Sequence, residues 1–166
     1  MTSQHPRVRV LCLPDLDRPI GGVKQLYRHV EHLIALGWDA AIVTEKPNFR
    51  PSWFDSTAPT IALSESQSRN ELCPENCILL LPETYIGVNL KSFYGLNISM
   101  LSRVVFNQNA YYSYGKISSQ TEKSLFNLYN ADSVLQVLSI SENTHTFLTR
   151  NIGLPDNRLS RIINSV

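Results

Sequence analysis

The chain has 166 residues, about the length of one domain, and 43% of them are hydrophobic, a composition that excludes a disordered protein. Its 15 Lys and Arg and 14 Asp and Glu leave a net charge of +1, so no strong field attracts nucleic acid or an anionic membrane. No apolar run approaches the roughly 20 residues that cross a bilayer. The three cysteines are an odd number, which favours cytosolic thiols over a disulfide framework. We therefore expect a soluble, cytoplasmic protein without a nucleic-acid partner.

The segment from Arg7 to Thr44 has the pattern of a strand, a helix and a second strand. An apolar run at 7–13 is followed by a polar turn that closes in Gly21 and Gly22. Apolar residues then recur with a helical period at positions 23, 26, 27, 30, 33 and 34, and Gly37 ends the pattern. The nearly all-apolar run at 38–44 is typical of a parallel strand buried on both faces. Together these elements predict a βαβ unit.

Strand and helix patterns continue to alternate along the rest of the chain. We expect strands at 60–63, 77–82, 103–107, 134–139 and 159–163, and helical segments at 64–72, in part of 87–101, at 121–129 and from Ser141 to near Gly153. Two long segments without a period, 46–57 and 108–119, are expected to be loops, and loops of this length are often functional. The pattern predicts an α/β fold: one Rossmann-like domain, residues 1–166, with a doubly wound parallel sheet and helices on both faces.

Gly21 and Gly22 precede the first predicted helix, at the carboxyl end of the first strand, where doubly wound sheets bind ligands. A helix N-terminus favours phosphate, and glycine lets a ligand approach the backbone closely. A tight turn between strand and helix also explains the pair. The spacing matches neither the G-x-G-x-x-G dinucleotide motif nor a P-loop. Lys24 can assist a phosphate, although it lies on the polar side of the helix.

Glu83 directly follows the strand predicted at 77–82. A carboxylate at the carboxyl end of a strand suits a general base or an acceptor for sugar hydroxyls. It also suits a cap for the segment that follows.

Asn107, Gln108 and Asn109 stand where the strand at 103–107 ends. Side-chain amides donate and accept hydrogen bonds, so the three residues fit a hydroxylated ligand or a polar turn. Tyr111 and Tyr112, together with Tyr114, follow in the same loop. Their rings suit stacking on a sugar or local packing.

Two pairs of potential metal ligands do not predict a metal site. His29 and His32 lie on the polar face of the first helix without a third ligand nearby, which indicates a solvated face. Cys73 and Cys77 have a C-x-x-x-C spacing without a second pair, and Cys77 is expected to be buried where a strand starts. We expect no metal.

Taken in order, the motifs resemble the N-terminal domain of GT-B glycosyltransferases of the family 4-like type. The motifs that carry the resemblance are Gly21-Gly22-Val23 before an amphipathic helix, Ala35 to Asp39, the strand ending 42–44, Leu81-Pro82-Glu83, Phe106 to Asn109, Leu138 to Glu142 before a helix, Ile152 to Pro155, and the final run 161–166. The resemblance covers nearly the whole chain, and the order of the motifs is what carries it.

The resemblance implies the acceptor-side half of a two-domain enzyme that moves a sugar from a nucleotide-sugar donor to a sugar or glycan acceptor. Such an enzyme needs no cofactor besides the donor as co-substrate. The C-terminal donor-binding domain would be absent, so we expect the chain alone to be inactive. The resemblance also allows peripheral membrane association of the full enzyme.

By position, the resemblance assigns roles to the residues singled out above. Gly21 and Gly22, with Lys24, would approach the donor diphosphate, and Glu83 is the candidate base. Gln108 stands where many members carry a histidine near the reacting sugar; since Gln cannot shuttle a proton, it is expected to hydrogen-bond a donor hydroxyl instead. The remaining candidates for substrate binding are Asn107, Asn109, Tyr111 and Tyr112.

Two other functions stay open at the level of sequence. One is the nucleotide-binding domain of an epimerase or reductase, which the missing G-x-G-x-x-G disfavours and which NAD binding would reveal. The other is a non-catalytic binding subunit that acts with a separate partner, which a tightly associated protein on purification would reveal.

Overall fold

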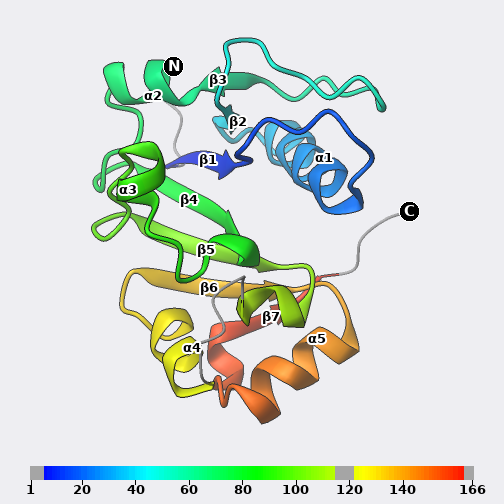
Figure 1. Ribbon diagram of the computed structural model, residues 1–166, viewed down its shortest axis with the longest axis vertical. Helices are drawn as coiled ribbons and strands as arrows, with labels where there is room; N and C mark the ends of the chain where they lie inside the picture. The colour runs from blue at the N-terminus through cyan, green and yellow to red at the C-terminus, as the bar shows by residue number, and fades with distance from the viewer. Residues whose placement is uncertain (1–5, 115–121, 163–166) are drawn as a thin grey trace. The chain divides into compact units, whose positions relative to one another are not determined.

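The chain divides into two compact units, Met1–Leu80 and Leu81–Val166, and the computed structural model describes residues 6–114 and 122–162 of it. Figure 1 labels the helices and strands of both units. Each unit has its own parallel strands and its own helices.

Four strands form the sheet of the first unit: β1 (Arg7–Leu11), β2 (Ala40–Thr44), β3 (Thr60–Ala62) and β4 (Cys77–Pro82), whose last two residues belong to the second unit. Their order is β3-β2-β1-β4, and each pairs in parallel with its neighbour. The chain adds β2 and β3 on one side of β1 and then returns to place β4 on the other. The strand order therefore reverses between β1 and β4, the kind of switch point near which open α/β sheets bind ligands.

Helix α1 (Gly21–Ala35) connects β1 to β2 and buries Leu26, Tyr27 and Val30. Ile34 was expected on the same face, but 40% of it is exposed. The helix ends as expected at Gly37, which has a left-handed φ of 84°. The Gly37 and Trp38 amides donate to the carbonyls of Ile34 and Leu33, the two hydrogen bonds of a Schellman motif.

The loop between β2 and β3 is held by carboxylates that precede it in the chain. Asp15 accepts hydrogen bonds from the amides of Glu45 and Lys46 at 2.8 and 2.9 Å, and Asp17 accepts one from the amide of Ser52 at 2.6 Å. The predicted loop at 46–57 is confirmed, and a short polar helix, α2 (Leu63–Ser68), follows β3 as expected.

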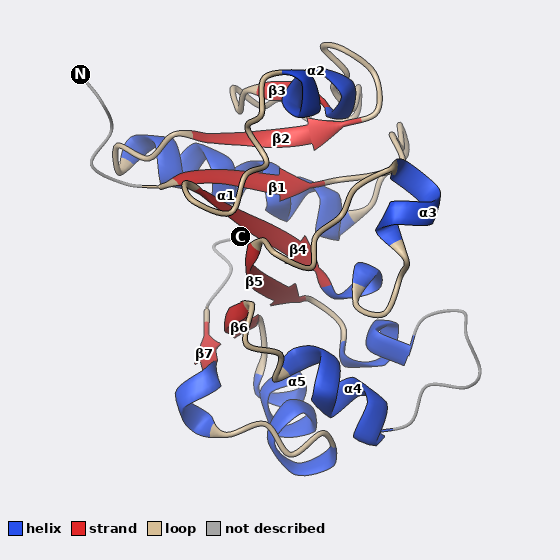
Figure 2. Ribbon diagram, turned by 90° about the vertical axis from the view of Figure 1, so that its left-hand side faces the viewer, coloured by secondary structure: helices blue, strands red, loops and turns tan. Residues whose placement is uncertain are grey.

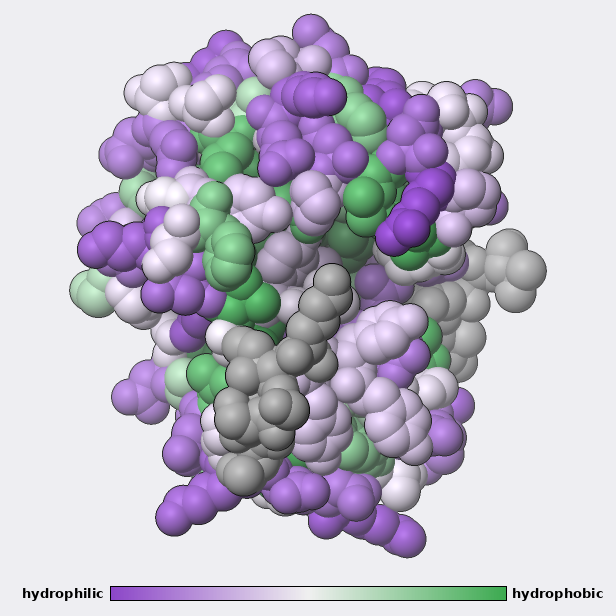
Figure 3. All heavy atoms as spheres, in the orientation of Figure 1, coloured by the Kyte–Doolittle hydropathy of each residue, from purple (hydrophilic) through white to green (hydrophobic). Residues whose placement is uncertain are grey.

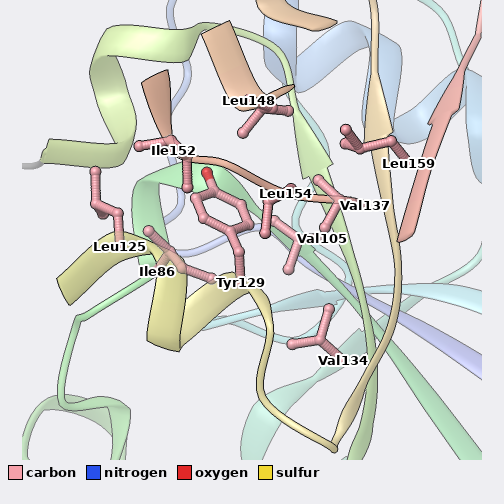
Figure 4. Packing of buried hydrophobic residues seen from close by; sticks show 10 residues of the cluster. All are labelled: Ile86, Val105, Leu125, Tyr129, Val134, Val137, Leu148, Ile152, Leu154 and Leu159. Atoms are coloured by element: carbon pink, nitrogen blue, oxygen red, sulfur yellow. The ribbon is translucent and has the colours of Figure 1, made fainter. Parts of the chain in front are cut away.

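The second unit contains β5 (Ser102–Asn107), β6 (Val134–Ser139) and β7 (Leu159–Arg161), in that order and in parallel. Its helices are α3 (Leu90–Tyr94), α4 (Glu122–Tyr129) and α5 (Glu142–Thr146), and α5 continues as a π-helical turn over Phe147–Asn151. Figure 2 shows α4 and α5 beside β6. Their apolar faces and the strands build one core, in which Tyr129 lies among aliphatic side chains (Figure 4).

Two elements of this unit begin at side chains that cap them. Ser141 accepts a hydrogen bond from the Thr144 amide at 3.1 Å, as its position before the helix predicted. Asn89 accepts one from the Ser92 amide at 3.1 Å. Helix α3 is much shorter than the segment in which it was expected, because Gly95 takes a left-handed φ of 65° and ends it.

Three 3₁₀-helices were not predicted: Glu83–Tyr85, Ala110–Tyr114 and Asp156–Arg158. The predicted loop at 108–119 is therefore partly helical, and its residues from 115 on lie outside the described part of the chain. The predicted α/β class with parallel strands in a Rossmann-like arrangement is confirmed.

The surface mixes hydrophilic and hydrophobic residues, with the hydrophilic ones spread over the face seen in Figure 3. Several large apolar side chains are nonetheless open to solvent, among them Phe93, Met100, Tyr111 and Tyr112. Within 6–114 and 122–162, no helix combines the length and apolar character needed to cross a bilayer.

Candidate functional site

Polar side chains gather in the second unit where β4 and β5 end. Glu83 is the first residue after β4, and Asn107 is the last residue of β5. Only 2% of Glu83 and none of Asn107 is exposed, so both carry polar atoms into the interior.

The Glu83 carboxylate is tied to the turn that follows β5. Its Oε1 accepts a hydrogen bond from the Asn109 amide at 2.9 Å, so Glu83 caps a distant turn instead of the segment directly after it. Burial raises the pKa of Glu83, and backbone hydrogen bonds from Gln108, Glu83 itself and Asn109 offset only part of that rise. Its other oxygen, Oε2, is buried without a hydrogen-bond partner among the described residues.

Asn107 anchors a buried network of polar side chains. Its Nδ2 donates to the Tyr129 hydroxyl at 2.6 Å and to Ser113 Oγ at 3.0 Å, and the two hydroxyls are 2.5 Å apart. Burial raises the pKa of Tyr129, so its hydroxyl stays protonated. Asn107 Oδ1 is buried and has no partner in the described part of the chain.

Glu83 Oε2 and Asn107 Oδ1 are thus two buried acceptors without a donor among residues 6–114 and 122–162. Buried polar groups nearly always have a partner, supplied by protein, water or ligand. A hydroxyl group or a water molecule has the chemistry to serve them. Burial raises the pKa of Glu83, and a carboxyl group can also take up or release a proton there.

The turn after β5 presents its aromatic side chains outward. Asn109 Oδ1 accepts a hydrogen bond from the Tyr111 amide at 3.0 Å, so Asn109 shapes a polar turn, one of the two interpretations of the sequence. Of the side chains that follow, 71% of Tyr111 and 58% of Tyr112 are exposed. Tyr114 packs locally, with its ring edge toward Phe147 at a centroid distance of 5.9 Å. Gln108 and Asn109 are half-buried beside them.

Gly21, Gly22 and Lys24 lie in the first unit, at the start of α1. A Cβ atom on Gly21 would meet nothing within 4 Å, and its φ is not left-handed, so neither packing nor backbone strain among the described residues requires glycine there. The first turn carries no acidic residue and no side-chain cap, which leaves the positive end of the helix dipole without a negative partner from those groups. Lys24 is exposed.

The structure therefore brings Glu83, Asn107, Gln108, Asn109 and the two exposed tyrosines into one unit, and it places the glycine pair and Lys24 in the other. Sequence reasoning missed Ser113 and Tyr129 as members of the polar network. Tyr129 had a detectable signal, because a tyrosine on the buried face of an amphipathic helix needs a partner for its hydroxyl. Ser113 had none.

Two of the four residues considered as metal ligands, His29 and Cys73, hydrogen-bond to other groups. His29 Nδ1 donates to the Gln25 carbonyl at 2.9 Å, and His32 is exposed. Cys77 is buried at the start of β4, as expected, and Cys73 Sγ donates to Asn76 Oδ1 at 2.7 Å. Among the residues that the structure describes, no three His, Cys, Asp or Glu side chains come together to hold a metal ion.

Comparisons of this chain with protein-family models, with curated proteins and with solved structures give no match.

Proposed function

We propose that this chain is the acceptor-binding half of a GT-B glycosyltransferase of the family 4-like type, which moves a sugar from a nucleotide-sugar donor to a sugar or glycan acceptor. In this proposal the chain is inactive alone and works with a donor-binding domain, which is its partner. The donor is a co-substrate, and no cofactor is needed. A cytoplasmic location, with peripheral membrane association of the full enzyme, belongs to the same proposal.

One observation carries the proposal: exposed tyrosine rings stand beside an amide-rich turn at the end of a parallel strand. Tyr111 and Tyr112 are 71% and 58% exposed, and Gln108 and Asn109 precede them on the turn after β5. Sugars are bound by hydrogen bonds to their hydroxyls and by stacking of their apolar faces on aromatic rings. The parallel α/β fold and the order of the motifs along the chain support the same conclusion.

The proposed roles combine the resemblance to the family with the burial and contacts of each residue. Glu83, with its raised pKa, is suited to accept a proton from an acceptor hydroxyl, and Gln108 to hydrogen-bond the donor sugar. Asn109, Tyr111 and Tyr112 would contact the acceptor. Asn107 is fully buried, so its proposed part in binding is to hold the turn through Tyr129 and Ser113. Gly21, Gly22 and Lys24 would face the donor diphosphate.

Saturation-transfer difference NMR tests the acceptor surface with the methyl glycosides of glucose, galactose, mannose and N-acetylglucosamine as probes. We expect saturation transfer to at least one glycoside. The double variant Tyr111→Ala/Tyr112→Ala should weaken that binding about thirtyfold, because each ring contributes about 1 kcal/mol of stacking. Phe93→Ala is the matched control, since Phe93 is also aromatic and 74% exposed but lies on α3.

Results of two kinds, from the glycosides and from NAD, would contradict the proposal. One is the absence of saturation transfer to every glycoside, or equal transfer in the tyrosine variant and the wild-type chain. The other is saturable binding of NAD, which would favour the epimerase or reductase alternative.

A further inference from the structure

The second unit contains a pocket of about 400 Å³ between the start of β5, helix α3 and helix α4. Its walls are mainly aliphatic, formed by side chains such as Leu90, Leu96, Ile98 and Leu128. The volume lies in the range of about 300–1,000 Å³ that small-molecule sites occupy, and mainly apolar walls with a few polar groups are typical of such sites. None of Glu83, Asn107 and Asn109 lines this pocket, so it is distinct from the candidate site at the ends of β4 and β5.

Arg103 is the second residue of β5 and lines the pocket. Its Nη2 donates to Ser133 Oγ, but its Nε is buried and has no hydrogen-bond partner in the described part of the chain. Arg103 forms no ion pair with any carboxylate among these residues. Burial lowers the pKa of Arg103, and no neighbouring negative charge offsets that effect. A half-buried guanidinium without a counter-charge is unfavourable, since proteins pair or hydrogen-bond the charges they bury.

The rest of the pocket wall does not supply the missing negative charge. Its described residues include no Asp or Glu, and the second charged residue among them is Lys91 of α3, which is also a cation. Asn127 of α4 adds a side-chain amide that can donate to an anion. The pocket thus combines two positive charges, amide donors and an aliphatic wall, an arrangement complementary to an anion attached to an apolar group.

We propose that this pocket binds a small organic anion, whose carboxylate or phosphate pairs with Arg103 and Lys91 and whose apolar body lies against the aliphatic wall. Arginine suits either oxyanion because its planar fork of N–H groups matches both geometries. The proposal is independent of the acceptor surface and of glycosyl transfer.

Isothermal titration of the chain with phenyl phosphate, phenylacetate and benzyl alcohol tests the proposal. We expect one of the two anions to bind at least tenfold more tightly than the neutral alcohol, and the preferred anion identifies the oxyanion. Arg103→Met should weaken that binding at least tenfold. It removes a cation that has no ion pair, so the variant should remain folded, as circular dichroism would verify.

Two further variants separate the pocket from general charge effects. Asn127→Trp keeps both cations but fills the pocket from the exposed side of α4, and it should also abolish binding. Arg150→Met removes an exposed arginine that does not line the pocket, and it should leave binding unchanged. Equal affinity in the wild-type chain, the Arg103 variant and the Asn127 variant would overturn the proposal, as would equal binding of the anions and the alcohol.

Discussion

Glu31 and Glu83 are two glutamates of low exposure whose pKa values move in opposite directions. Burial alone would raise the pKa of Glu31, but hydrogen bonds from Ser56 Oγ at 2.6 Å, Arg28 at 2.6 Å and the Thr57 amide at 2.8 Å outweigh it and hold the pKa at about 2. At Glu83 burial dominates and the pKa is raised. Glu83 is buried more deeply than Glu31, and its donors are neutral backbone amides, whereas one donor of Glu31 is the cation of Arg28.

These shifts predict that the effects of Glu31→Gln and Glu83→Gln on the free energy of unfolding depend on pH in opposite ways. Because the folded-state pKa of Glu31 lies below its ordinary value of 4.5, its contribution is complete above that pH and is lost as the pH falls toward 2. Glu31→Gln should therefore lower the free energy of unfolding at pH 7 by about 1 to 2 kcal/mol, with a smaller loss as the pH falls. Urea unfolding followed by circular dichroism between pH 3 and about 8 measures both variants.

Glu83→Gln should show the reverse trend. A raised folded-state pKa means that the folded chain binds the proton more tightly, so the wild-type chain loses stability as the pH rises from 4.5 through that pKa. The Glu83→Gln variant keeps an oxygen for the Asn109 amide and has no charge to bury. Its free energy of unfolding should therefore rise relative to that of the wild-type chain as the pH rises. Profiles for the two variants that run parallel to each other would refute the assignment of these shifts.

Residue-level roles were only partly predictable from the sequence. Glu83 and Asn107 stand at the carboxyl ends of strands, the edge where ligands bind, so the sequence predicted polar groups accessible to a ligand there. Asn107 is buried against Tyr129, 22 residues away, and against Ser113, which a 3₁₀ turn brings to its side-chain amide. Contacts at such a separation leave no periodic trace in the sequence.

At the scale of elements, hydrophobic periodicity predicted the strands and the longer helices well. β4 occupies the expected residues 77–82, and α1 starts two residues before its first periodic position. The 3₁₀-helices escaped prediction because a single turn has no periodic face, and α3 was overestimated because apolar residues continue beyond Gly95. Short elements depend on caps and tertiary contacts more than on a repeating pattern.

Strand β1 contains a charged residue that the apolar pattern does not explain. Arg9 is 4% exposed, and its Nε donates to Glu71 at 2.8 Å while its Nη1 donates to Asp39 at 3.0 Å. Glu71, which follows α2, is 9% exposed. The pair joins β1 to the segment after α2 in the interior of the first unit.

Removing one partner of this pair should destabilise the folded chain. Glu71→Gln should lower the free energy of unfolding by about 3 kcal/mol, because it leaves a buried guanidinium with Asp39 as its remaining carboxylate. The double variant Arg9→Met/Glu71→Gln should lose less than the single variant, since no uncompensated charge remains. Urea unfolding measures the free energy of unfolding of each variant, with Glu65→Gln as the control.

Glu65 pairs with Arg69 on the surface of the same unit, where the side chains are 42% and 61% exposed. Its removal should change stability by about 0.5 kcal/mol or less. Equal losses for Glu65→Gln and Glu71→Gln would show that the buried pair contributes no more than a surface pair.

At the scale of the whole molecule, the fold class followed from the alternation of elements, but the two compact units did not. The division between the units falls between Leu80 and Leu81, inside the apolar run of β4. It is not marked by the polar, proline-rich or glycine-rich linker that separates domains, so the sequence offered no composition change to reveal it. β4 therefore contributes residues to both units.

This shared strand leads to a prediction about cooperativity. Leu148 is fully buried in the core of the second unit, and Leu148→Ala should lower the free energy of unfolding by about 2 to 5 kcal/mol through the lost contacts and the cavity. Leu135 on β6 is 48% exposed, so Leu135→Ala should cost about 1 kcal/mol or less.

The loss caused by Leu148→Ala should appear in both units. β4 pairs with β1 through Cys77 to Leu80 and then runs directly into the second unit, so unfolding of that unit frees one end of the strand. We expect a single urea transition, and hydrogen exchange in the variant should rise by a similar factor for amides of β1 and β6. If the amides of β6 alone lost protection, the two units would unfold independently and β4 would not couple them.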